Sequence, residues 1–198
     1  MKNVKSKIFI LIGLFFWFLN QANANEVKFL DISKLPEITG NFEKPKVVGK
    51  NEFKFFGLKI YNIQLVDEER FNIKNYNPNR SFLYQNQIAI VIEYKRDFSR
   101  EVLVKKTVDE IARINNINYP IILDQYQTHF QRIFSPVFAG DRKTAIFNVK
   151  TGVKLFLNGK PIGEIKDLIF AKRFMDVWLS EKSAYPKMTK AILGKDDF

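Results

Sequence analysis

The chain of 198 residues contains no cysteine and a single histidine, His129. The absence of cysteine excludes disulfide bonds, thiolate metal sites and thiol chemistry, so the fold must depend on packing alone. His129 has no second histidine, no cysteine and no close acidic partner that would complete a metal-binding set. We therefore expect no metal site and no cofactor, and we interpret His129 as an ordinary surface or boundary residue.

Long hydrophobic runs are also scarce, and the one that exists lies near the start, from Ile8 to Leu19. Three lysines precede it (Lys2, Lys5 and Lys7), and small residues follow it at 22–24. The run is about a dozen residues, whereas a helix needs roughly 20 to cross a bilayer. This pattern predicts a secretory signal peptide cleaved near Ala24, in preference to a membrane anchor. The mature chain would then be one soluble domain, 25–198, in the periplasm or outside the cell.

Acidic residues are in deficit, with 21 Asp and Glu against 32 Lys and Arg, a formal net charge of +11. Removing the three lysines of the predicted signal peptide leaves about +8. The lysines are scattered, which is typical of solvated faces. A basic exported protein meets anionic lipid far more often than nucleic acid. We therefore expect no nucleic-acid binding and consider an anionic membrane surface as a partner.

Two segments, Glu52 to Val66 and Gln87 to Arg96, are rich in aromatic and β-branched residues and predict strands. Gly57 interrupts the first, so it is one long bent strand or two short ones. The segment Glu68 to Asn86 between them is polar and asparagine-rich and contains Pro78. This composition predicts a surface loop.

Two helices are expected next, because apolar residues recur at spacings of three and four. Ser99 can cap the first helix, and Pro120 can open the second. The buried face of the first would carry Leu103, Val104, Thr107, Val108, Ile111 and Ile114. That of the second would carry Ile122, Tyr126, Phe130 and Ile133.

The last third of the chain predicts a three-stranded meander followed by two helices. Apolar residues alternate from Ala145 and again from Val153, with turns at Thr151-Gly152 and Asn158-Gly159. Pro161 places the final strand, Lys160 to Ile165, at a sheet edge or gives it an irregular start. Asp167 can cap the next helix, and a last short helix begins near Pro186 and stops at Gly194. The fold class is therefore α+β, an antiparallel sheet covered on one face by helices.

Five stretches in this order and spacing resemble the bacterial chalcone isomerase-like proteins, in particular their exported branch. They are VGKNEFKFFGLKIYNIQL, EYKRDFSREVLVKKTVDE, FAGDRKTAIF, LFLNGKPIGEI and FAKRFMDVWLSEKS with AILG, and together they span Val47 to Gly194. The resemblance implies an open-faced β-sandwich with a cleft between a large antiparallel sheet and its helices. In the wider family that cleft holds flavonoids in the plant enzymes and fatty acids in plastid relatives.

The family's catalytic groups are not matched. The resemblance implies an arginine just before the first core strand, where this chain has Lys50-Asn51-Glu52-Phe53-Lys54. It also implies a tyrosine immediately before the first covering helix, where this chain has Phe98. The chain also lacks a nucleophile elbow and a phosphate-cradling glycine loop. We therefore predict no catalytic residue.

Six residues are candidates for contact with a ligand: Arg142, Lys54, Lys50, Tyr61, Phe98 and Trp178. Among the cations Arg142 is favoured, because its planar fork can hold both oxygens of a carboxylate. The alternative for Arg142 is that it and Asp141 only fix their loop. The alternative for Tyr61 and Trp178 is that they belong to the core.

Three hypotheses about function follow. The first is non-catalytic binding of a fatty acid or a similar apolar molecule in the cleft. The second is an envelope interaction or maintenance module whose cleft is filled by its own phenylalanines. The third is an isomerase with a rearranged site.

Overall fold

The computed structural model describes residues 27–68 and 87–195. The predicted signal peptide with its cleavage site lies outside the described residues, as does nearly all of the predicted surface loop. Among the described residues no helix combines the length and the apolar composition needed to cross a membrane.

Six antiparallel strands form one sheet, and each strand pairs with the next one along the chain. The strands are β1 (Pro45–Phe55), β2 (Leu58–Glu68), β3 (Ile88–Tyr94), β4 (Arg142–Asn148), β5 (Gly152–Leu157) and β6 (Lys160–Ile165). The predicted meander of β4, β5 and β6 is confirmed. Its Asn158-Gly159 turn has positive φ at both residues, as a type I′ hairpin requires. The strand with Pro161 lies at the sheet edge, as expected.

The first aromatic segment differs from both alternatives offered by the sequence. It is neither one bent strand nor two short ones, because β1 and β2 are long strands of 11 residues each that form a hairpin. The break at Gly57 is a full reversal of the chain, with φ of 47° at Phe56 and 77° at Gly57. β1 also begins well before the aromatic run, at Pro45.

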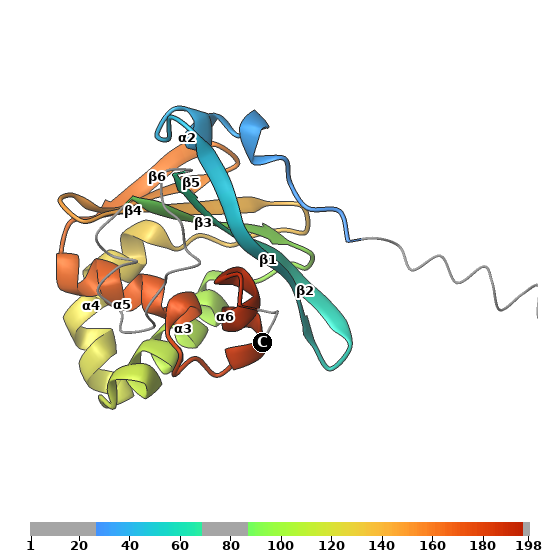
Figure 1. Cartoon of the computed structure of the whole chain (residues 1–198). Helices are drawn as coiled ribbons and strands as arrows, with labels where there is room; N and C mark the ends of the chain where they lie inside the picture. Colours follow the sequence, from blue (N-terminus) through green and yellow to red (C-terminus); the bar gives the residue numbers. More distant parts are fainter. Residues whose placement is uncertain (1–26, 69–86, 196–198) are drawn as a thin grey trace, which may run out of the picture.

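Four helices cover one face of the sheet (Figure 1). They are α3 (Arg100–Asn115), α4 (Tyr119–Ile133), α5 (Leu168–Leu179) and α6 (Pro186–Ile192). The predicted caps are present, since Ser99 accepts a hydrogen bond from the Val102 amide and Asp167 accepts from the Ile169 amide. The main core lies between these helices and the sheet, and it includes the apolar residues of β2 to β6 that face the helices.

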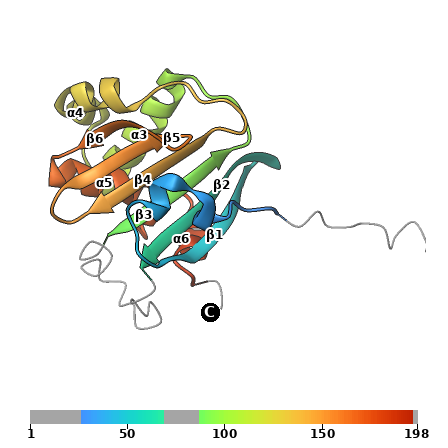
Figure 2. The same ribbon diagram turned by 90° about the horizontal axis from the view of Figure 1, so that it is seen from above.

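A smaller layer covers part of the other face, which the sequence did not lead us to expect. It consists of the short helices η1 (Ile32–Lys34) and α2 (Pro36–Thr39), which lie over the sheet in Figure 2. Ile38 of α2 is fully buried against Val66, Val91 and their neighbours. The fold is nonetheless the predicted α+β class, an open antiparallel sheet with its main helical layer on one side.

Candidate ligand cavity

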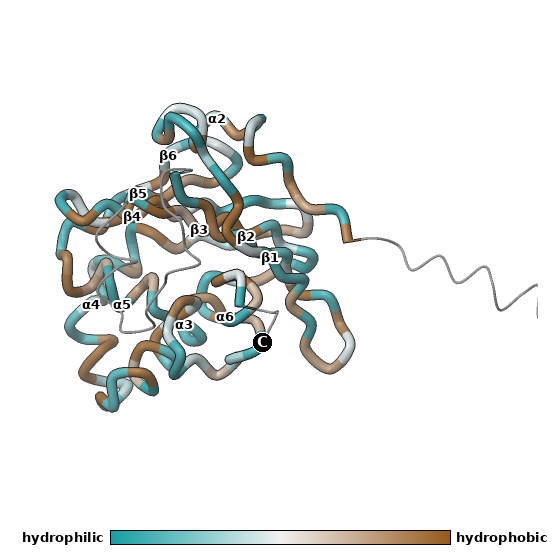
Figure 3. Tube along the Cα trace, viewed as in Figure 1, coloured by the Kyte–Doolittle hydropathy of each residue, from teal (hydrophilic) through white to brown (hydrophobic). Residues whose placement is uncertain are grey.

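A cavity of about 380 Å³ lies between the sheet and its main helical layer. Strands β1 to β5 form its floor, and α3, α5 and the segment leading into α6 form its other walls. Its lining is mostly apolar and rich in aromatic rings, including Phe53, Tyr61, Tyr94, Phe98, Phe134 and Trp178. In Figure 3 much of the central strands is coloured brown, at the hydrophobic end of the scale.

The aromatic rings of the wall pack on one another. Phe53 stacks on Tyr61 with ring centroids 5.0 Å apart and meets Tyr185 edge-on at 4.5 Å. Tyr94 meets Phe98 at 6.0 Å. Aromatic pairs at such separations add packing energy beyond the area they bury, so this wall is held in place without a ligand.

An ion pair closes the side of the cavity near α6. Arg113 of α3 holds the carboxylate of Glu110 through two bonds, of 3.0 and 2.7 Å. The same carboxylate accepts the backbone amide of Ala184 at 2.9 Å, and Arg113 also donates to the Lys182 carbonyl. These bonds tie the segment before α6 to α3, so they fix the position of one wall.

Lys143 is the cation that the sheet contributes to the cavity wall, whereas Lys106 and Arg113 line it from α3. It lies on β4 opposite Ile92 and Leu157, and its Nζ is 3.3 Å from the carbonyl oxygen of Ser135 and 5.3 Å from the ring centre of Phe134. Within the described residues no carboxylate lies within ion-pair distance of this Nζ. Burial lowers the pKa of Lys143 to about 8, an effect that the charge of Asp141 only partly offsets. The ammonium is thus poorly compensated.

Two tyrosine hydroxyls belong to the same cavity. Burial raises the pKa of both Tyr61 and Tyr94 above the usual range, so both hydroxyls stay protonated and can donate. The hydroxyl of Tyr61 already contacts the sulfur of Met188 at 3.4 Å. The hydroxyl of Tyr94 has no hydrogen-bond partner among residues 27–68 and 87–195. Tyr94 follows Ile92 by two residues and so lies diagonally across from Lys143 on the same sheet face.

Three of the six predicted site residues meet in this cavity. Tyr61 enters from β2, Phe98 from the segment before α3, and Trp178 from α5. Segments far apart in the sequence therefore converge, and a contact of these residues with ligand stays a prediction.

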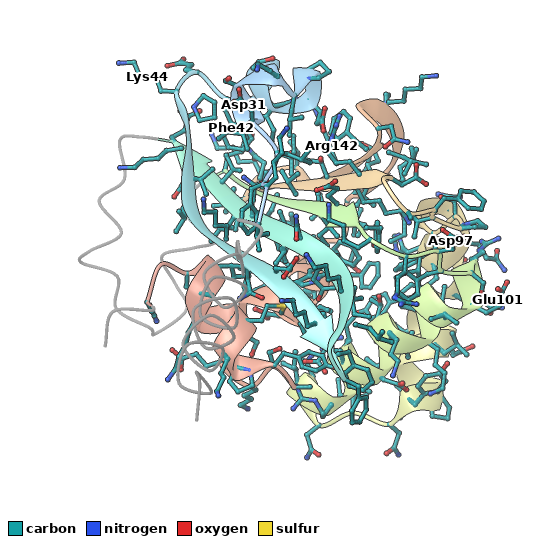
Figure 4. The ribbon with its side chains drawn as sticks, turned by 90° about the vertical axis from the view of Figure 1, so that its right-hand side faces the viewer. Asp31, Phe42, Lys44, Asp97, Glu101 and Arg142 are labelled. Atoms are coloured by element: carbon teal, nitrogen blue, oxygen red, sulfur yellow. The ribbon has the colours of Figure 1, made fainter. Side chains whose placement is uncertain are left out.

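Arg142, the favoured cation, points to the opposite face of the sheet, on the side covered by α2 (Figure 4). There it holds the carboxylate of Glu37 through bonds of 2.8 and 3.2 Å, and Thr144 donates to the same carboxylate at 2.8 Å. Burial alone would raise the pKa of Glu37, but the bonds from Arg142 and Thr144 lower it below its ordinary value. Arg142 anchors α2 to the sheet, so the structure does not bring it to the cavity.

The two other predicted cations also lie away from the cavity lining. Lys50 borders an open hollow between β1 and residues 27–32, where its Nζ stands 4.8 Å from the ring centre of Phe29. Lys54 pairs with Glu52 at 2.7 Å near the hairpin turn. Neither position suits the head group of a molecule bound between the sheet and its helices.

Lys143 and Tyr94 are the residues that sequence analysis missed. The signal for Lys143 was present, because residues 143, 145 and 147 alternate along one strand and Ala145 and Phe147 were expected to face the core. A lysine two residues before Ala145 must therefore face the helices. Sequence analysis favoured the neighbouring Arg142 instead, whose side chain points to the opposite face of the sheet.

The described residues hold no group of three or more His, Asp or Glu side chains that could bind a metal ion. The cavity offers hydrogen-bond donors and, on its β4 side, the ammonium group of Lys143 beside largely apolar walls. It can bind and orient an apolar molecule that has a single acidic or polar end.

Comparisons with known proteins identify the family. A fatty-acid binding protein of Arabidopsis thaliana is similar in structure, with a TM-score of 0.54 and 9% identity over 77% of this chain and 88% of that one. A comparison with curated protein sequences gives no match. The family model described as chalcone isomerase-like matches residues 55–194, which include the four main helices and strands β2 to β6. The chain therefore belongs to the chalcone isomerase-like family.

Proposed function

We propose that this protein binds a fatty acid, or a similar apolar molecule with an anionic end, in the cavity between the sheet and its helices, without transforming it. One observation carries the proposal: Lys143 lies in the wall of an apolar cavity of about 380 Å³ with no carboxylate to pair with among the described residues. Ligand pockets span roughly 300–1,000 Å³, so this cavity suits a small ligand or a single acyl chain.

The division of roles in binding follows from the lining. The aromatic and aliphatic walls would supply most of the affinity, at about 0.8 kcal/mol for each methylene removed from water. A carboxylate buried without a partner would be costly, and Lys143 provides the opposite charge. We assign a second bond to the hydroxyl of Tyr94, a cavity residue that lies diagonally across from Lys143 on the adjacent strand.

The structural similarity to the Arabidopsis protein supports this proposal at the level of the fold. The Arabidopsis protein is named as a fatty-acid binding protein, and its fold places a sheet and helices in the same arrangement. The cavity also favours ligand binding over an interaction module filled by its own phenylalanines. Phe53, Phe98 and Phe134 are partly buried and line the space, and they leave it open.

We also propose that the protein acts in the periplasm or outside the cell. The support is the charged start, the short apolar run and the small residues before Asn25. N-terminal sequencing of protein recovered from the host's envelope fraction tests this. We expect a first residue near Asn25, and a chain that begins at Met1 would refute export with cleavage.

The binding proposal is tested in two steps. Native mass spectrometry of the protein from its own host should show a retained mass in the range of a fatty acid. Titration with dodecanoic acid should then change the fluorescence of Trp178, the only tryptophan beyond residue 24, which lines the cavity. Absence of both a retained mass and a saturable signal would refute ligand binding and favour the interaction module.

A further inference from the structure

The turn of the β1–β2 hairpin carries exposed apolar side chains. Phe56 is 90% exposed, and Phe55 and Leu58 are about half exposed. The hairpin projects beyond the body of the molecule (Figure 1), and its end is coloured toward the hydrophobic side of the scale in Figure 3. We call these three residues with Gly57 the hairpin tip.

The backbone at the hairpin tip makes this composition costly. Phe56 has φ of 47°, in the left-handed region where a bulky side chain is rare and Asn or Gly is preferred. Asn158, at the matching position of the β5–β6 turn, follows that preference with φ of 50°. Folding alone therefore gives no reason for an exposed phenylalanine at residue 56. Such strain at an exposed position points to a role outside the fold.

The hairpin tip is continuous with the cavity. The ring of Phe55 is 4.6 Å from that of Phe56, and Phe55 also lines the cavity. Val102 of α3, another exposed apolar residue, lines it as well. The exposed apolar surface of the tip and the cavity mouth thus form one path.

The charges beside the tip are mainly positive. Lys54 and Lys59 flank the turn, about half exposed, and share the single carboxylate of Glu52 at 2.7 Å each, which leaves one excess positive charge. Residues 96–101, at the same end of the sheet and running into the first turn of α3, balance their acids with arginines. Asp97 and Glu101 (Figure 4) alternate with Arg96 and Arg100. The whole chain carries +11.

We propose that the hairpin tip docks on a lipid bilayer that contains anionic lipids. Its apolar side chains enter the interfacial region, and the flanking lysines meet the head groups. Aromatic rings suit this interface, because an apolar ring can lie among the acyl chains while nearby polar groups stay in water. The docking would turn the cavity mouth toward the membrane. It goes beyond the proposed function and does not require that the cavity bind a ligand.

A second copy of the chain is a less suitable partner for the hairpin tip than a bilayer. A stable protein interface buries roughly 800 Å² on each partner, and three side chains on a projecting turn offer much less than that. A bilayer imposes no such requirement, because a few inserted apolar residues and basic neighbours suffice for reversible attachment.

The test uses the chain from Asn25 on, which contains every residue of both core clusters. Binding to vesicles of phosphatidylcholine alone is compared with binding to vesicles that also contain phosphatidylglycerol, by co-sedimentation. The variant is Phe56→Asn, because Asn favours the turn's left-handed conformation and so keeps the hairpin. The matched control is Ile169→Asn, which removes a 65% exposed apolar side chain at the opposite end of the sheet.

We expect the protein to bind the anionic vesicles, and we expect added salt to weaken this binding. Phe56→Asn should lower the partition coefficient about tenfold, while Ile169→Asn leaves it unchanged and the melting temperature of Phe56→Asn does not fall. Equal binding by the wild type and Phe56→Asn would overturn the proposal, as would no binding by the wild type. A concentration-dependent dimer that Phe56→Asn abolishes would assign the tip to a second copy instead.

Discussion

Replacing Lys143 by Met should weaken the binding of a fatty acid and spare that of the corresponding alcohol. Methionine keeps most of the apolar stem of lysine and removes the charge, so the cavity wall stays filled. A hydrogen bond to a charged group contributes about 1.5–3 kcal/mol net. In the free protein the Lys143 ammonium makes a long bond of 3.3 Å to the Ser135 carbonyl, which it can lose when it turns to the ligand.

We take about 2 kcal/mol as the effect, which corresponds to a loss of about thirtyfold in affinity for dodecanoic acid. Dodecanol gains its affinity from the apolar walls and lacks a charge, so its dissociation constant should change by less than about twofold. Isothermal titration calorimetry measures both ligands. Lys154→Met is the control, because Lys154 lies on the neighbouring strand β5 with its side chain exposed.

Three results would refute this reasoning. If Lys143→Met lowers the affinity for the acid and for the alcohol equally, the residue shapes the cavity and does not hold a head group. If Lys154→Met lowers the affinity for the acid as much as Lys143→Met does, the net charge of the protein and not the position of Lys143 is responsible. If Lys143→Met binds the acid as tightly as the wild type, the head group lies elsewhere. Lys143→Arg, which keeps the charge, should retain part of the affinity.

The remaining predictions concern the effect of pH on Lys143, the ion pair of Arg142, and catalysis. Because the pKa of Lys143 is about 8 in the folded protein and higher when unfolded, dodecanoic acid should bind more weakly above pH 8. From pH 8 to about 10 the contribution of Lys143 to the free energy of unfolding should instead rise. In this range Lys143 keeps its proton in the unfolded chain and has lost it in the folded protein. Urea denaturation of the wild type and Lys143→Met across this pH range measures whether that contribution rises. Arg142→Ala should lower the free energy of unfolding by about 3 kcal/mol, because it leaves the carboxylate of Glu37 without its cation. The side chain of Glu37 is 0% exposed. Weaker binding of a fatty acid with unchanged stability would contradict the structural role of Arg142. Purified protein should not accelerate chalcone cyclisation above the buffer rate. The chain lacks the arginine that the family resemblance implies, and it has Phe98 where the resemblance implies a tyrosine, so the family's donors to an enolate are not matched. A saturable rate that heating abolishes would show otherwise.

The order of elements from β3 to α6 could be predicted from the sequence because it depends on local chemistry. The caps at Ser99 and Asp167, the Asn158-Gly159 turn and the edge position of Pro161 each depend on a few neighbouring residues. Strand alternation and helical spacing then determined which faces are buried. These signals are short-range, and they sufficed for the fold class.

The candidate site depended on tertiary structure. Arg142 and Lys143 are neighbours in sequence, yet one pairs with Glu37 beneath α2 and the other lines the cavity beside Phe134. The reason is that side chains alternate across a strand, so a one-residue difference places a cation on the opposite face. Whether that face is covered by the four helices or by α2 is set by other segments of the chain. Glu37 of α2 lies 105 positions before Arg142, and only the packed fold brings such segments together.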